Sequence, residues 1–283
     1  MLGYRHAFHA GNHADVLKHL VLMLALERLC AKDKPLWYID THAGAGRYRL
    51  GSGVAAGHEE YGEGIGKLWG AADLPAPLAR YRELVRGFNP GGKLRCYPGS
   101  PALADALLRR GDRLWLHELH PADAAALARE FKDHADRARV IAADGFDGLR
   151  ALLPPQPRRA LVLIDPSYEL AEDYRRVPKA LGEALQRFAT GVYAVWYPLL
   201  ARRESRLLVE RLQSLGAAHW LHARLEVRRA IGPDSGLHGS GLFIVNPPFG
   251  VAAALRECTA ALRSLLEQRP GEGDFRVEAG ESR

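Results

Sequence analysis

The sequence has few cysteines and no long apolar run. Its 283 residues include three cysteines, Cys30, Cys96 and Cys258, which lie far apart and form no Cys-x-x-Cys pair. That spacing excludes a disulfide scaffold and a zinc ribbon, and it is typical of a reducing cytosol. The apolar stretch 20–26 is far too short to span a bilayer, and the first 15 residues do not resemble a signal peptide. We therefore expect a soluble, cytoplasmic, monomeric protein with no membrane partner.

The glycine pattern of nicotinamide-dependent dehydrogenases is also missing. Gly44 and Gly46 follow a short apolar stretch, but no third glycine stands at the spacing of Gly-x-Gly-x-x-Gly. A test for NAD binding would check this exclusion. His9 and His13 stand one helical turn apart and leave a metal site as an alternative. Because no carboxylate or cysteine sits at companion spacing there, we expect no metal.

The composition is that of a globular protein with a modest basic excess. Apolar residues make up 47% of the chain and charged residues 25%, and the formal net charge is +6. The length is ample for a buried core, in one large domain or in a domain with an insertion. The basic excess favours a polyanionic partner without requiring one.

Apolar residues alternate between strand and helix spacing along most of the chain. A first helix is expected after Asn12, a suitable N-cap. Strands are expected at 36–39, 113–118, 138–142, 160–164, 191–196, 219–227 and 241–245. Seven strands with helices between most of them predict an α/β fold with a mostly parallel sheet, covered on both faces. No helix separates the last two strands, which predicts an antiparallel hairpin at one edge.

Residues 51–97 interrupt this alternation. They are rich in glycine and contain helical stretches near 61–69 and 78–88. We interpret them as an inserted helical subdomain, so the main domain comprises residues 1–50 and 98–283. The tail after Arg269 is polar and glycine-rich, and we expect it to be partly disordered.

Acidic residues close three successive strands of the predicted sheet. Asp40, Glu118 and Asp144 each follow an apolar stretch, at the edge where open α/β sheets bind ligands. A carboxylate in the position of Glu118 can accept two hydrogen bonds from a ribose diol, and Asp144 suits the amino group of an adenine. The three acids favour a nucleoside cofactor, although each one alone could be a solvated strand end.

The strand 160–164 leads into Asp165-Pro166-Ser167-Tyr168. An adenine N6 amine is a poor nucleophile because its lone pair is delocalised into the ring. The Asp165 carboxylate and the Pro166 carbonyl can accept its two N–H bonds, while Tyr168 could stack on a flipped-out base. An Asp-Pro pair after a strand is also a common turn. Its interpretation as a catalytic motif therefore depends on its position after the fourth strand.

The N-terminal segment 4–19 is rich in histidine and other polar residues. One interpretation is a solvated first turn. Another is that this helix lies across the methionine end of the cofactor and the target base, and the sequence leaves both open.

Long motifs in this sequence resemble the bacterial 23S ribosomal RNA adenine-N6 methyltransferase family. The likeness covers nearly the whole chain. It is carried by the segments 4–19, 40–48, 97–101, 118–121, 143–146, 163–166, 196–198 and 246–248.

The resemblance implies a class I, Rossmann-like methyltransferase fold that uses S-adenosylmethionine (AdoMet) as methyl donor and 23S rRNA as substrate. By position it implies cofactor contacts at His19, His42, Ser100, Glu118, Asp144 and Gly145. Asp165 would be the catalytic acceptor, with Tyr4, His6 and Lys18 near the target adenine. The family pattern is Asp-Pro-Pro-Tyr, whereas this chain has Ser167 in the third place, so we expect activity with some loss of loop rigidity.

Two alternatives to this function remain at the level of sequence. Only the family resemblance distinguishes an RNA adenine methyltransferase from a DNA adenine methyltransferase. The intact Asp165-Pro166 pair disfavours a non-catalytic RNA-binding protein. A second motif, Asn246-Pro-Pro-Phe249, matches the general amino-methyltransferase pattern more literally. Chain order favours Asp165, because Asn246 ends the last expected strand and too little chain follows it to bind a cofactor.

Overall fold

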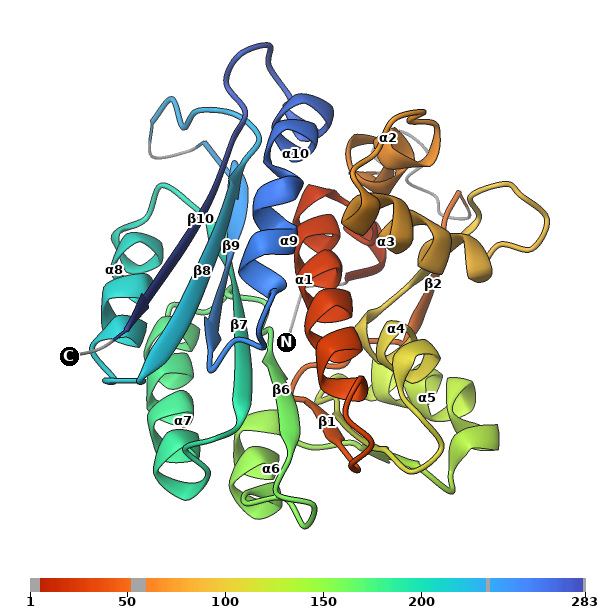
Figure 1. Cartoon of the computed structure of the whole chain (residues 1–283), viewed down its shortest axis with the longest axis vertical. Helices are drawn as coiled ribbons and strands as arrows, with labels where there is room; N and C mark the ends of the chain where they lie inside the picture. Colours follow the sequence, from red (N-terminus) through yellow and green to blue (C-terminus); the bar gives the residue numbers. More distant parts are fainter. Residues whose placement is uncertain (1–5, 52–59, 233–234, 282–283) are drawn as a thin grey trace.

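The chain folds around one mixed sheet. The computed structural model describes residues 6–51, 60–232 and 235–281. The main sheet has eight strands in the order β10-β8-β9-β7-β6-β1-β4-β5 (Figure 1). Their bounds are β1 (Trp37–Asp40), β4 (Arg113–His117), β5 (Ala138–Ile141), β6 (Ala160–Ile164), β7 (Val192–Leu199), β8 (His219–Glu226), β9 (Gly239–Val245) and β10 (Asp274–Glu281). All run parallel except β9 and β10, which run in the opposite direction.

The predicted α/β class and mostly parallel sheet are confirmed. The predicted number of strands and the prediction of which strands form the edge of the sheet were wrong. The eighth strand, β10, pairs antiparallel with β8 from Asp274 to Glu281, in the tail that was expected to be partly disordered. The antiparallel pair β8–β9 is present, yet β9 lies between β7 and β8, and β10 forms the edge. An edge strand with polar residues at alternate positions has low mean hydropathy, which explains the error.

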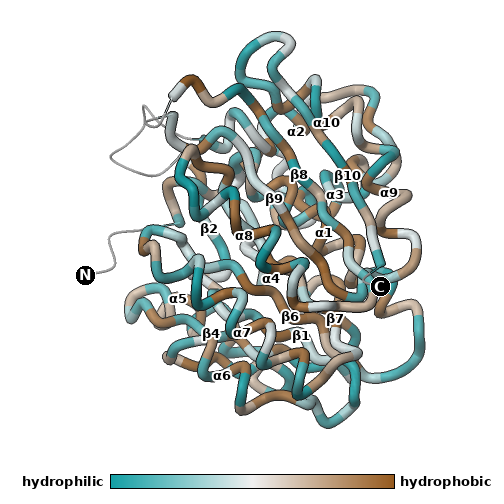
Figure 2. Tube along the Cα trace, turned by 90° about the vertical axis from the view of Figure 1, so that its left-hand side faces the viewer, coloured by the Kyte–Doolittle hydropathy of each residue, from teal (hydrophilic) through white to brown (hydrophobic). Residues whose placement is uncertain are grey.

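Helices cover both faces of the sheet, as the alternating sequence predicts. Along β6, Leu161 and Leu163 belong to one buried cluster, whereas Val162 and Ile164 belong to the other. The first face carries α1 (His13–Cys30), α4 (Ser100–Leu107), α5 (Pro121–Glu130), α9 (Val251–Glu257) and α10 (Thr259–Leu266). The second face carries α6 (Gly145–Leu152), α7 (Asp173–Arg187) and α8 (Arg203–Gln213). Apolar segments accordingly gather in the central strands (Figure 2).

Helix α1 is buried along its first 14 residues. Asn12 caps it, because its side-chain oxygen accepts the backbone N–H groups of Ala14 and Asp15 at 2.9 and 3.0 Å. The helix packs against α4, β9 and α9. Three of the buried polar residues of this helix, Asp15, Lys18 and His19, line a cavity. Within the described ranges, no helix has both the length and the apolar character needed to cross a membrane.

The segment interpreted as an insertion connects two short strands, β2 (Arg47–Arg49) and β3 (Cys96–Pro98), which form a separate two-stranded sheet. Its described part contains the 3-10 helix η2 (Glu60–Glu63) and the helices α2 (Ile65–Trp69) and α3 (Ala76–Gly87). The start of α2 touches the N-terminal segment, since the Ile65 N–H donates to the Gly11 carbonyl at 2.8 Å. A Cβ on Gly64 would lie 2.1 Å from that oxygen, so only glycine permits this contact.

Candidate active site

A cavity of about 380 Å³ opens at the carboxyl ends of the parallel strands. It lies beside β1 and β6, where the strand order reverses, as ligand sites do in open α/β sheets. Ten predicted site residues line it together: His6, Lys18, His19, His42, Ser100, Glu118, Asp144, Gly145, Asp165 and Pro166. Tyr4 lies outside the described residues. The fold thus assembles in one place side chains that are widely separated in the sequence.

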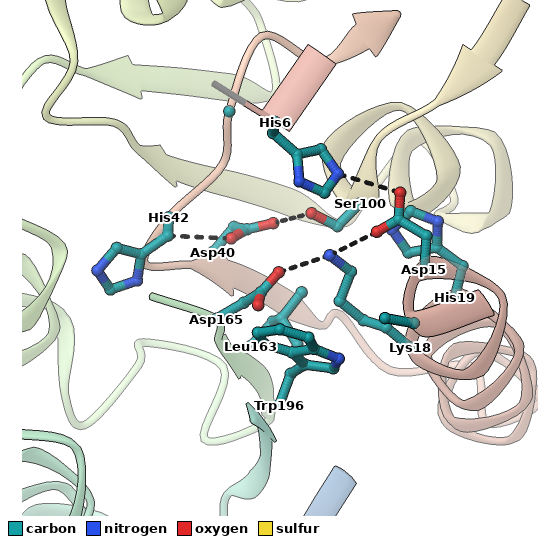
Figure 3. Close-up of polar contacts among 12 residues, drawn as sticks. His6, Asp15, Lys18, His19, Asp40, His42, Ser100, Leu163, Asp165 and Trp196 are labelled. Carbon is teal, nitrogen blue, oxygen red and sulfur yellow. Dashed lines mark hydrogen bonds and ion pairs between the residues drawn. The ribbon is translucent and has the colours of Figure 1, made fainter. Parts of the chain in front are cut away.

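At one end of the cavity, Lys18 lies between two carboxylates. Its Nζ is 2.6 Å from Asp165 Oδ2 and 2.9 Å from Asp15 Oδ1. The other oxygen of Asp15 accepts the Gly11 N–H at 2.8 Å and lies 3.0 Å from His6 Nε2. Figure 3 shows this continuous series of contacts from His6 to Asp165. It connects the N-terminal segment to the loop after β6.

Burial and neighbouring charges act against each other on these groups. Burial raises the pKa of Asp165 to about 6, although Lys18 opposes the rise. Burial also disfavours the Lys18 cation, but Asp15 and Asp165 outweigh it and hold its pKa well above the usual value. The pKa of Asp15 lies well below its usual value, because His6 and Lys18 overcome the effect of burial. Lys18 is therefore a cation held between two buried carboxyl groups.

Glu118 follows β4 and reaches the loop after β1. Its Oε2 accepts the Gly44 N–H and its Oε1 accepts the His120 N–H, both at 2.7 Å. Burial raises its pKa despite these two hydrogen bonds. The carboxylate therefore lines the cavity and also fixes the glycine-containing turn.

Asp144 follows β5 and caps α6. Its Oδ1 accepts the Phe146 N–H at 2.9 Å, and its Oδ2 accepts from Arg176 of α7 at 2.6 Å. The Arg176 guanidinium lies 4.5 Å from the centroid of the Phe146 ring. Gly145 packs so closely on Thr41 that a Cβ there would lie 2.0 Å from the Thr41 oxygen. Arg176 lines the same part of the cavity and was not predicted from the sequence.

Asp40, the first of the three strand-end acids, lies behind the cavity and has no exposed surface. It accepts hydrogen bonds from the Tyr38 and Ser100 hydroxyls, both at 2.7 Å, and from the His42 N–H at 3.2 Å. Burial raises its pKa. Asp40 therefore orients Ser100 and the backbone of His42, and these two residues reach the cavity (Figure 3).

Two histidines of the cavity are neutral at pH 7. Burial lowers the pKa of His19 to about 3 and that of His42 to about 4. His19 Nδ1 lies 2.8 Å from the Tyr97 hydroxyl, whereas its Nε2 is buried and has no hydrogen-bond partner among the described residues. An unsatisfied buried nitrogen in a cavity wall is the kind of group that a bound ligand satisfies.

Tyr168 does not reach the cavity, contrary to the stacking role predicted for it. Its side chain is 1% exposed, its hydroxyl donates to the Trp196 carbonyl at 2.8 Å, and its ring packs on Tyr174. The residue has φ +54°, a conformation that is uncommon for a residue other than glycine. This conformation turns the ring into the core, where it supports the loop. Trp196 of β7 lines the cavity instead.

The second motif lies at the opposite end of the sheet. Asn246 ends β9, which runs against the parallel strands, so it sits near their amino ends. Its side-chain amide donates to the carbonyls of Ala189 and Gly191 at 2.7 and 2.8 Å, in the loop that precedes β7. After Asn246 the described chain forms only α9, α10 and β10.

His9 and His13, the two histidines of the metal alternative, have different surroundings in the structure. His9 Nδ1 pairs with Glu60 at 3.0 Å, and His13 is buried with its pKa lowered by burial to about 4. No group of three or more histidine, cysteine or acidic residues that could hold a metal occurs in the part of the chain that the structure describes.

The main sheet is mostly parallel, and its strand order reverses beside β1. Acidic residues follow β4 and β5, and an Asp-Pro turn follows β6. Together these features define a Rossmann-like methyltransferase. A family model described as "Ribosomal RNA large subunit methyltransferase D, RlmJ" matches residues 33–278. The chain belongs to this family.

Similar proteins agree with this assignment. Proteins named ribosomal RNA large subunit methyltransferase J are 48% identical in Escherichia coli K12, over 94% of both chains, and 46% identical in Haemophilus influenzae, over 98% of both. A crystal structure of a Legionella pneumophila protein has a TM-score of 0.88 and 36% identity, and the match covers 96% of this chain and 98% of that one.

Proposed function

We propose that this protein transfers a methyl group from AdoMet to the N6 amine of an adenine in 23S rRNA. The observation that carries the proposal is the position of Asp165. Its carboxylate lines the cavity after β6, and one oxygen is held by Lys18 at 2.6 Å. The relatives named as large-subunit rRNA methyltransferases support the substrate class.

The residues of the cavity fit AdoMet. Glu118 presents a carboxylate for the ribose hydroxyls, and Asp144 presents one for the adenine amino group. His19, with its unpartnered Nε2, lies on α1 together with Lys18, and Ser100 and His42 complete the wall. AdoMet supplies an electrophilic methyl group on its sulfonium when it is bound.

The catalytic step requires acceptors for the N–H bonds of the target amine. Lys18 occupies Asp165 Oδ2, which leaves Oδ1 for one N–H bond, and the Pro166 carbonyl is the second acceptor. Acceptance of both bonds allows the nitrogen to pyramidalise and direct its lone pair at the methyl group. Trp196 is the aromatic side chain beside Asp165 that can contact the base (Figure 3).

The rate is expected to fall in acid. Asp165 is a strong acceptor for an N–H group only as a carboxylate, and burial raises its pKa to about 6. Because the raised pKa belongs to the folded enzyme, kcat should be full well above pH 6 and decline as pH falls through about 6. A pH–rate profile at saturating AdoMet and RNA measures this limb. A profile that stays flat down to pH 4.5 would contradict the role of Asp165.

The function is tested by transfer of labelled methyl from AdoMet into free 23S rRNA, 16S rRNA, assembled ribosomal subunits and duplex DNA. Nucleoside mass analysis of the product should detect N6-methyladenosine from 23S rRNA. Label in duplex DNA alone would identify a DNA methyltransferase. AdoMet binding without label in any substrate would favour a non-catalytic RNA-binding protein.

We also propose that residues 51–97 form a subdomain that contacts RNA. Its six cations, Lys67, Arg80, Arg82, Arg86, Lys93 and Arg95, stand against five acids, a net charge of +1. Several of these cations form ion pairs within the protein, for example Arg80 with Glu27 and Arg86 with Glu83. Lys93 and Arg95 form no side-chain ion pair with another described residue, so they are the better candidates.

Replacing Lys93 and Arg95 together by alanine should weaken RNA binding and leave AdoMet affinity unchanged. Each lost phosphate contact should lower the slope of log K against log salt by about 0.7–0.9. The matched control is the Arg80→Ala/Arg86→Ala pair, which should change the slope less. An unchanged slope for Lys93→Ala/Arg95→Ala would remove this surface from the RNA interface.

A further inference from the structure

Asp15 is a buried carboxylate on α1 that has no direct role in the proposed methyl transfer. It is 2% exposed and lies in the buried part of the helix. Three donors surround it: the Gly11 N–H, His6 Nε2 and Lys18 Nζ, all within 3.0 Å. A buried carboxylate whose hydrogen-bond partners are all present is rigid, so it can keep a flexible neighbouring side chain in place.

Lys18 is the flexible neighbour. A lysine side chain has a long aliphatic stem and loses much rotamer freedom when it is fixed. Asp15 lies one helical turn before Lys18, so both side chains project from the same face of α1. With Asp15 on one side and Asp165 on the other, the ammonium group is held at 2.9 and 2.6 Å. The Trp196 ring, whose centroid is 5.7 Å from Nζ, bounds it further.

We propose that Asp15 is a positioning residue for methyl transfer: it holds Lys18 on Asp165 Oδ2, so that Oδ1 remains for the target amine. This inference rests on the proposed function, because it assigns Asp165 as the acceptor. Asp15 also receives His6 and Gly11, so it joins the N-terminal segment to the catalytic loop. The same carboxylate thereby fixes His6 in the wall of the cavity.

The charged and titratable groups of this assembly come from four parts of the chain. They are His6 from the N-terminal segment, Asp15, Lys18 and His19 from α1, Asp40 from the end of β1, and Asp165 from the loop after β6. Among them Asp15 raises the pKa of both Lys18 and Asp165, whereas Lys18 lowers the pKa of Asp165 and outweighs this effect of Asp15. When Asp15→Asn releases Lys18 from Asp165, the Asp165 titration therefore shifts to higher pH.

The test is the Asp15→Asn variant, which preserves shape and removes the charge. We expect kcat to fall roughly 10- to 100-fold through misplacement of the acceptor, with AdoMet Kd within about twofold of wild type. The acid limb of the pH–rate profile should move to higher pH. The matched control is Asp112→Asn, because Asp112 is also buried and accepts a backbone N–H and a cationic side chain, but lies outside the cavity. It should leave both kcat and the limb unchanged.

A second measurement covers loss of stability in Asp15→Asn. If Asp15 acts on Lys18, Asp15→Asn should lower the melting temperature less in a Lys18→Met background than in the wild type, because the interaction that it breaks is then already absent. Equal losses in the two backgrounds would overturn the proposal. So would an Asp15→Asn enzyme with wild-type kcat, or one with reduced kcat and an unmoved acid limb.

These outcomes are separate from failure of the proposed function. If wild-type protein binds AdoMet and methylates no RNA adenine, the function fails and the kinetic comparison has no baseline. The melting comparison remains valid in that case, because it measures the coupling of Asp15 with Lys18 without any substrate.

Discussion

The Asp165→Ala variant is expected to bind AdoMet and to lose nearly all methyl transfer. Removal of the carboxylate deletes the acceptor for one N6–H bond and leaves Lys18 with Asp15 alone. Loss of one preorganised transition-state contact lowers rates by about 10² to 10³. The added loss of the Lys18 partner places the expected effect at the upper end of that range. Single-turnover transfer of labelled methyl measures it, with calorimetry for AdoMet binding.

The Asn246→Ala variant is the matched control, because a motif scan alone would choose Asn246-Pro-Pro-Phe249. Its side chain bonds two carbonyls at the amino end of β7, away from the cavity. We expect it to keep substantial activity, with a loss of stability of about 1 kcal/mol per hydrogen bond. An inactive Asn246→Ala enzyme beside an active Asp165→Ala enzyme would overturn both the site and the mechanism.

Glu118→Ala is expected to weaken AdoMet binding by about 1.5–3 kcal/mol, the usual range for hydrogen bonds to a charged group. That corresponds to roughly 10- to 100-fold in Kd. Two effects contribute: the ribose hydroxyls lose their acceptor, and the Gly44 N–H loses the carboxylate that fixes its turn. Isothermal calorimetry measures the affinity.

Glu118→Gln separates these two effects. It keeps one oxygen acceptor and so preserves part of the turn, but it lacks the negative charge. We expect an affinity between those of wild type and Glu118→Ala. Unchanged affinity in Glu118→Ala, with an unchanged melting temperature, would mean that AdoMet binds elsewhere.

The class of the fold and its central strands could be predicted from the sequence, because buried parallel strands are short continuous apolar stretches. The stretches before Asp40 and Asp165 are unambiguous in this respect. The strands β2, β3 and β10 could not be found in this way. Three-residue strands have no detectable period, and β10 is covered on only part of its surface.

Much of the candidate site was predictable for a topological reason. The carboxyl ends of parallel strands share one edge, so acids after successive strands must converge. Side-chain direction after a turn is not determined by topology, and for this reason the role of Tyr168 was wrong. Asp15 was not predicted as a site residue, because an Asp and a Lys three residues apart on a helix are typical of an ordinary surface ion pair. Only the burial of α1 distinguishes the two cases.

The burial of α1 has a consequence for the order in which this protein matures. The helix packs against β9 and α9, which are synthesised about 200 residues after it. Its apolar surface therefore lacks its final cover until β9 and α9 have been synthesised, and such long-range contacts slow folding. The helix that carries Asp15 and Lys18 is thus completed by one of the later segments of the fold.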